Sequence, residues 1–94
     1  MTIWKFPLAV TDTQTVHIPQ RHNILTCQIQ GGLPCLWVMV DERQPVVAAR
    51  TVHVIGTGHP LPTSHLTYIG TVQMAGGALV WHVFIEGELG EGGL

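Results

Sequence analysis

The sequence predicts an all-β protein, folded as a small antiparallel β-sandwich or open barrel of six to seven strands. No stretch carries the i, i+3, i+4, i+7 apolar spacing of an amphipathic helix over three turns. Instead, short runs rich in Val, Ile, Thr and aromatic residues alternate with turns that contain Gly, Pro or Asn. A chain of 94 residues is too short for a second domain.

Seven runs are expected to form the strands, and together they make one β domain over residues 1–86. In chain order they are Ile3–Val10, Thr15–Ile18, Ile24–Gln30, Cys35–Val40, Val46–Ile55, Leu66–Met74 and Leu79–Glu86. The most polar stretch, Asp41–Pro45, is expected to be an exposed turn. Residues 87–94 are rich in glycine and acids, so we expect a flexible tail that does not pack.

The register of the first hairpin follows from the pairing of apolar side chains. A four-residue loop at Gly31–Pro34 would place Cys27 opposite Val38 and Leu25 opposite Val40 on one face. The other face would then pair Gln28 with Trp37. This register sends Cys27 and Cys35 to opposite faces, which forbids a disulfide bridge and predicts two buried reduced thiols.

The last hairpin is expected to turn at Gly76-Gly77, because two glycines tolerate the positive φ angles of a primed turn. The predicted pairs are Met74 with Leu79, Val72 with Trp81, Thr71 with His82 and Tyr68 with Ile85. Gly70 falls opposite Val83 on the apolar face, where its missing side chain indicates a bend or room for a neighbouring group.

The composition indicates self-association and argues against nucleic acid. Apolar residues make up 46% of the chain and charged residues only 11%, which is too much apolar surface for 94 residues to bury internally. We therefore expect a homo-oligomer. Four basic residues against six acidic ones give a net charge of −2, which disfavours duplex DNA or RNA. No apolar run approaches the roughly 18 residues of a membrane span, and no secretory signal is recognisable, so we expect a cytoplasmic protein.

Catalytic and metal-binding motifs are missing from the sequence. The six histidines lack the spacing of a zinc site and no Cys-x-x-Cys accompanies them, so no metal is expected. His65-Leu66-Thr67 matches only half of the paired His-x-Thr signature of two-histidine phosphoesterases. The lone serine, Ser64, has no nucleophile elbow around it. We expect a protein that is not an enzyme and that uses no cofactor.

The candidate ligand site centres on Arg50, a charged residue within an otherwise apolar strand. Its guanidinium could either extend to solvent along a polar face or form bidentate bonds to a phosphate. If Val40 pairs near Val47, Arg50 falls opposite Trp37. The glycine turn that follows could present backbone N–H groups to the same phosphate. The candidate ligand-binding residues are Arg50, Trp37, Gly56, Thr57, Gly58, His59 and His82.

Four sequence blocks carry a resemblance to a known group of proteins: IWKFPL from Ile3, PCLW from Pro34, GTGH from Gly56 and LVWHVF from Leu79. Together they resemble a family of short bacteriophage and prophage proteins without an assigned activity. The resemblance implies work in the host cytoplasm during infection. Among such roles, the residues favour a non-enzymatic anti-defence protein that binds and sequesters a nucleotide second messenger, either a cyclic oligonucleotide or an ADP-ribose derivative.

A second hypothesis belongs to a different class. The apolar faces and exposed strand edges would equally suit a structural or protein-docking accessory protein with no small-molecule ligand.

Overall fold

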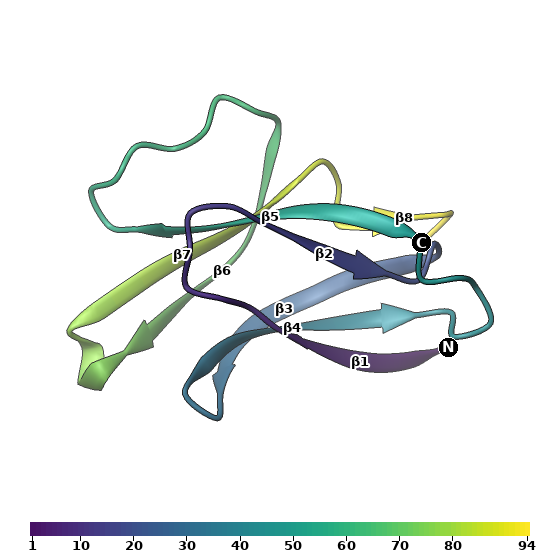
Figure 1. Cartoon of the computed structure of the whole chain (residues 1–94), viewed down its shortest axis with the longest axis horizontal. Coiled ribbons are helices and arrows are strands. Elements are labelled where there is room, and N and C mark those ends of the chain that lie inside the picture. Colours follow the sequence, from purple (N-terminus) through teal and green to yellow (C-terminus); the bar gives the residue numbers. More distant parts are fainter.

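Two four-stranded antiparallel sheets pack against each other in the computed structural model, which describes all 94 residues (Figure 1). The first sheet has the order β1 (Thr2–Pro7), β4 (Leu33–Val40), β3 (His22–Gln30) and β8 (Gly90–Glu91). The second has the order β2 (Gln14–Ile18), β5 (Ala48–Gly56), β7 (Leu79–Glu86) and β6 (Leu66–Met74). The predicted all-β sandwich is confirmed, with an eighth strand formed by residues near the C-terminus. No helix in the structure has the length and apolar character needed to cross a membrane.

The core lies between the two sheets, where each strand contributes every second side chain. Leu36, Val38 and Val40 alternate inward along β4, and Val52 and Val54 do the same along β5. These side chains are almost completely buried. The alternation along these segments makes the strand pattern recognisable in the sequence, because one face of each segment contacts the partner sheet.

The predicted register of the first hairpin is wrong. Gly31 and Gly32 form a two-residue turn with φ angles of 61° and 79°, and Gln30 pairs directly with Leu33. The tighter turn shifts the pairing by two residues. As a result, Cys27 lies opposite Leu36, Gln28 opposite Cys35, and Trp37 opposite Thr26. The predicted thiol state is confirmed, since both cysteines are buried and free.

A β-bulge at Leu25 then changes which side chains of β3 face inward. Ile24 pairs with Val38 and is buried, whereas Leu25 is exposed rather than opposite Val40. The bulge inserts one extra residue, so the apolar alternation of β3 reverses its phase at this point.

The last hairpin is confirmed near its turn. Gly76 and Gly77 have φ angles of 65° and 93°, and Met74–Leu79, Val72–Trp81 and Thr71–His82 are paired as predicted. A second bulge, at Ile69, ends this agreement and places Tyr68 opposite Phe84 rather than Ile85.

Gly70, next to this second bulge, lies close to the backbone of β3. A Cβ atom on Gly70 would lie 3.4 Å from the backbone carbonyl oxygen of Cys27 in β3. Position 70 therefore has room for a Cβ in ordinary contact with the β3 backbone, but not for a branched side chain. The bulges of β3 and β6 both lie at this close approach.

The expected pairing of Val40 near Val47 is wrong, because β4 and β5 lie in different sheets. Residue Asp41 begins the crossover between the sheets, and β5 pairs instead with β2, which sets Arg50 opposite Val16. Arg50 and Trp37 are therefore not cross-strand neighbours. Four strand ends also differ from prediction by two or more residues. β1 stops at Pro7 rather than Val10, β3 starts at His22 rather than Ile24, β4 starts at Leu33 rather than Cys35, and β5 starts at Ala48 rather than Val46.

Residues 87–94 pack against the sandwich, although the sequence predicted no packing for them. Gly90 and Glu91 form β8 and pair with Asn23 and His22 of β3. The amide of Ile24 donates to the Leu89 carbonyl at 2.9 Å, and the Leu89 side chain packs against the core. The glycines do not prevent this arrangement, because the segment is held through backbone groups.

Candidate functional site

The structure divides the predicted site residues among three places. Gly56, Thr57, Gly58 and His59 form the turn that ends β5, and His82 lies next to this turn on β7. Arg50 lies six positions before Gly56, which is about 20 Å along an extended strand, and next to Glu91 of β8. Trp37 lies in the other sheet, between Lys5 and Thr26. Only the turn and His82 form one site.

Arg50 is occupied by contacts within the fold. Its side chain is almost completely buried, and Nη1 donates a hydrogen bond of 2.7 Å to Nε2 of His22. Nη2 donates to the carbonyl oxygens of Glu86, at 3.2 Å, and of Glu88. Nη1 also lies 3.6 Å from the carboxylate of Glu91. The guanidinium therefore holds the C-terminal segment to the sandwich through its hydrogen bonds to Glu86 and Glu88 and its ion pair with Glu91.

His22 completes this buried cluster. Its Nδ1 contacts the Pro19 carbonyl at 2.7 Å, and a carbonyl can only accept, so Nδ1 carries the proton. Nε2 consequently accepts the bond from Arg50, which can only donate. Burial, and to a smaller extent the charge of Arg50, lower the pKa of His22 below its ordinary value of 6.5.

The other three cationic side chains are also engaged away from the turn. Lys5 donates to the side chain of Gln30 at 2.6 Å. Arg43 binds the buried carboxylate of Asp41 with two hydrogen bonds, of 2.9 and 3.0 Å, and lowers the pKa of Asp41 to about 2. Arg21 lies 3.7 Å from the same carboxylate. No lysine or arginine is thus available beside the glycine turn.

The turn itself is fixed by two glycines. The amide of His59 donates to the Gly56 carbonyl at 3.1 Å, and Gly58 has a φ of 86°, which favours glycine. A Cβ on Gly56 would meet the ring of Trp81 at 3.2 Å and the ring of His59 at 3.4 Å. Glycine at position 56 therefore allows both rings to pack over the end of β5.

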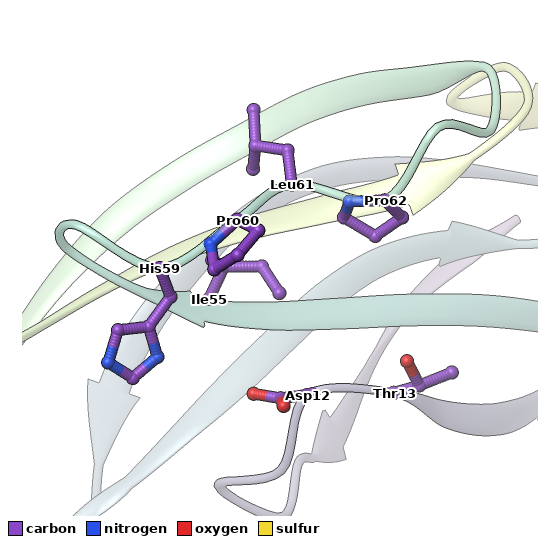
Figure 2. A pocket seen from close by; sticks show the side chains of 7 residues that line it. All are labelled: Asp12, Thr13, Ile55, His59, Pro60, Leu61 and Pro62. Atoms are coloured by element: carbon purple, nitrogen blue, oxygen red, sulfur yellow. The ribbon is translucent and has the colours of Figure 1, made fainter.

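Two hollows border the segment 57–65 that follows this turn, and His59 lines both of them. The first, here named the Asp12 hollow, has a volume of about 300 Å³ and is lined by Asp12, Thr13, Ile55, His59, Pro60, Leu61 and Pro62. Figure 2 shows Asp12 and Thr13 on the connection before β2, facing the segment His59–Pro62, with Ile55 of β5 between them. The second, the Leu79 hollow, has about 330 Å³ and is lined by Gly56, Thr57, His59, Ala78, Leu79, Val80 and Trp81.

A chain of four hydrogen-bonded side chains runs across the outer face of the second sheet beside these hollows. Thr57 Oγ1 lies 2.7 Å from Nε2 of His82, and Thr71 Oγ1 lies 3.0 Å from Nδ1 of the same ring. Thr71 in turn contacts the Tyr68 hydroxyl at 2.5 Å. These contacts fix the orientation of the His82 ring and connect the glycine turn to the exposed surface of β6.

A histidine–carboxylate pair lies beneath the Asp12 hollow. His53 is nearly buried; its Nε2 lies 2.8 Å from Glu86, and its Nδ1 lies 3.0 Å from the Thr13 hydroxyl. Hydrogen bonds from His53 and from Ser64 lower the pKa of Glu86. The acid therefore lies between the histidine and the serine, so the imidazole does not activate the Ser64 hydroxyl. No three histidine, cysteine or acidic side chains are grouped as metal ligands.

Asp12 lines the first hollow but is not among the candidate residues that the sequence predicts. The other five carboxylates each lie against a basic nitrogen: Asp41 at Arg21 and Arg43, Glu42 at the N-terminal amine, Glu86 at His53, Glu88 at His65 and Glu91 at Arg50. Asp12 has no ion pair and its carboxylate accepts no hydrogen bond from the chain. Its connection before β2 contains no motif, so only the fold reveals that it faces the proline-containing segment.

The comparisons with known proteins give one match. A family model described as "Domain of unknown function (DUF7352)" matches residues 1–92. No curated protein and no solved structure matches the chain. The family match includes β8, so the C-terminal strand is part of the shared domain.

Proposed function

This chain belongs to the DUF7352 family, and we propose that it is a non-catalytic binding protein that docks a protein partner. The docking surface is the loop face, which we define as residues 57–65 together with the Asp12 hollow and the Leu79 hollow. The sequence favours nucleotide sequestration over protein docking. We propose the opposite order because no basic side chain is available at the loop face to bind a phosphate.

The observation that carries the proposal is the chemistry of the loop face. No lysine or arginine lines either hollow, and all four of these side chains are engaged elsewhere. Leu61 and Leu79, which border the two hollows, are 55% and 45% exposed. Exposed leucines around a rigid proline-containing segment are typical of a surface that contacts another protein.

The volumes of the two hollows also favour a protein partner over a nucleotide. Sites for small molecules have volumes of roughly 300–1,000 Å³, so each hollow is at the lower end of that range. A hollow of this size fits one side chain of a partner better than a cyclic oligonucleotide. The arrangement of Ser64, Glu86 and His53 likewise offers no activated nucleophile, which supports a role without catalysis.

The resemblance to short phage and prophage proteins supplies the setting for this function. It favours a partner among phage or host proteins, met in the host cytoplasm during infection. The docking surface does not use the strand edges, which leaves them free for self-association.

Site-specific photocrosslinking in bacterial cells tests the proposal. A photoreactive phenylalanine analogue at Leu61 or Leu79 should give a discrete adduct with a different protein. The matched control is Ile29, which is 36% exposed and lies at the end of β3 in the other sheet. Equal adducts from Ile29, or adducts only with a second copy of the chain, would refute docking at the loop face.

Nucleotide sequestration is retained as a second candidate function because one observation favours it. Gly56, Thr57, Gly58, His59 and His82 do lie together, and Trp81 in the wall of the Leu79 hollow has a buried Nε1 without a hydrogen-bond partner. That indole N–H has no acceptor within the chain. Calorimetry with cyclic di- and trinucleotides and ADP-ribose derivatives distinguishes the two functions, because micromolar binding of any of them would replace the docking proposal.

A further inference from the structure

We propose that the Asp12 hollow receives a basic side chain, an arginine or a lysine, of the protein partner. The inference rests on the proposed docking function and names the chemistry of the group that enters this hollow. It assigns Asp12 as the residue that binds the charged end of that side chain.

Charge is the first argument. Of the six acidic side chains, Asp12 alone lies apart from every basic nitrogen of the chain. The other five carboxylates each lie within 4.0 Å of a basic nitrogen of the fold, which leaves Asp12 as the carboxylate without such a contact at the loop face. A carboxylate in this position attracts a cation and repels a phosphate or another acid.

The walls of the hollow provide the second argument. Ile55, which is nearly buried, forms the floor, and Pro60 and Pro62 face it from the opposite segment (Figure 2). These groups form an apolar surface along which the methylene stem of an arginine or lysine can lie. A basic side chain combines such a stem with a charged end, and so matches apolar walls with one acid at the rim.

Rigidity is the third argument. Thr13 follows Asp12 directly, and its hydroxyl contacts the buried Nδ1 of His53, which also lies 3.1 Å from the Asp12 carbonyl. Two contacts thus hold the backbone that presents the Asp12 carboxylate. On the far wall, His59 is held by the turn of Gly56–His59 and offers a flat ring on which a guanidinium can stack. The site is formed before the partner arrives, which reduces the entropy cost of binding.

A titration with N-acetyl-arginine amide, followed by the backbone amide signals of the 15N-labelled full chain, tests the inference. The signals of Thr13 and Ile55 should shift in a saturable manner, whereas N-acetyl-citrulline amide, which has the same shape without the charge, should leave them unchanged. N-acetyl-lysine amide serves as the second basic probe. Asp12→Asn should weaken binding roughly tenfold, as expected for one charge-assisted contact. Glu42→Gln, at an exposed acid far from the hollow, should not weaken it.

Three results would overturn the inference: no saturable shift with either basic probe, equal shifts with citrulline, or unchanged binding by Asp12→Asn. The amide spectrum of Asp12→Asn shows directly whether the variant is folded. The outcomes also separate the two proposals. Crosslinking at Leu61 combined with an ineffective Asp12→Asn would retain the docking function and reject the basic side chain. Saturable arginine binding without any protein adduct would retain the cation site and reject docking.

Discussion

Nη1 of Arg50 donates a hydrogen bond of 2.7 Å to Nε2 of His22, and this contact joins β5 of one sheet to β3 of the other. Both side chains are buried, and Glu91 of β8 lies 3.6 Å from the same guanidinium. An arginine in an apolar strand is thus explained by its position beneath the C-terminal segment, whose carbonyls require donors. The sequence predicts that Arg50 binds a ligand, but in the structure its guanidinium binds His22 and the C-terminal segment.

The first prediction concerns the pH dependence of stability through His22. Burial lowers the pKa of His22 in the folded chain, whereas the unfolded chain takes up its proton near the ordinary value of 6.5. The unfolded state therefore binds more protons as pH falls below about 6.5, and the free energy of unfolding must decrease there. Protonation of His22 at Nε2 would also place an N–H donor against the N–H donor of Arg50. Arg50 and Glu91 are the charged side chains next to the His22 ring.

Thermal unfolding between pH 7.5 and 5 measures this effect. The melting temperature should fall toward acid pH, and the exposed control variant His17→Gln should show the same fall. Ring nitrogen shifts at neutral pH should report a protonated Nδ1 and an unprotonated Nε2 for His22. A melting temperature independent of pH, or titration of His22 at or above 6.5, contradicts the account.

The second prediction concerns Arg50→Ala. The substitution removes the donors to His22 and to the carbonyls of Glu86 and Glu88. We expect the free energy of unfolding to drop by about 1.5–3 kcal/mol, the usual worth of hydrogen bonds that involve a charged group. Hydrogen exchange should accelerate most at Gly90 and Glu91 of β8. The control is Lys5→Ala, since Lys5 contacts only the exposed side chain of Gln30. Equal exchange at β8 in both variants would exclude this role for Arg50.

The third prediction concerns the close approach of β6 to β3. Gly70→Ala places a Cβ at 3.4 Å from the Cys27 carbonyl, an ordinary contact, and should be tolerated. Gly70→Val adds two methyl groups at the same point and should destabilise the fold by about 1–3 kcal/mol through overpacking. Urea unfolding of both variants compares them directly. Equal midpoints for the alanine and valine variants would show that the backbones are not in contact there.

The fourth prediction concerns self-association, which the apolar composition suggests. β1 is an edge strand of its sheet; Ile3 is 58% exposed, and Trp4 and Phe6 are only partly covered. Light scattering should show a dimer or larger assembly, and Ile3→Lys should dissociate it, because a charge on an edge strand opposes pairing. Val47→Lys, at a residue that is 60% exposed outside the strands, is the matched control. A monomer at tens of micromolar would refute the prediction.

Much of the fold could be predicted from the sequence because apolar alternation and glycine turns are local signals. Gly76-Gly77 set the register of β6 and β7 near the turn as predicted. The predicted register at Gly31-Gly32 is wrong because the prediction includes Leu33 and Pro34 in the loop, whereas Leu33 is the first residue of β4. The bulges at Leu25 and Ile69 were not predictable, since they depend on the contact between β3 and β6, far apart in sequence.

Only part of the candidate site could be predicted from the sequence, because the rest depends on contacts between residues far apart in the chain. The segment after Gly56 was identified from its glycines and prolines, and His82 does lie beside it. A charge in an apolar strand predicts a ligand site at Arg50, but no local signal indicates that His22 and the C-terminal carbonyls bind its guanidinium. Asp12 carries no motif, and its importance follows only from the pairing of every other acid in the folded chain.

The most direct test of the account is mass spectrometry of the adduct formed by a photocrosslinker at Leu61. We expect a crosslinked peptide from a different protein with an arginine or lysine adjacent to the attachment point. Its yield should fall strongly in the background of Asp12→Asn and stay unchanged with Glu42→Gln. Crosslinked peptides derived only from the chain itself, or partner peptides without a basic residue whose yield is unaffected by Asp12→Asn, would contradict it.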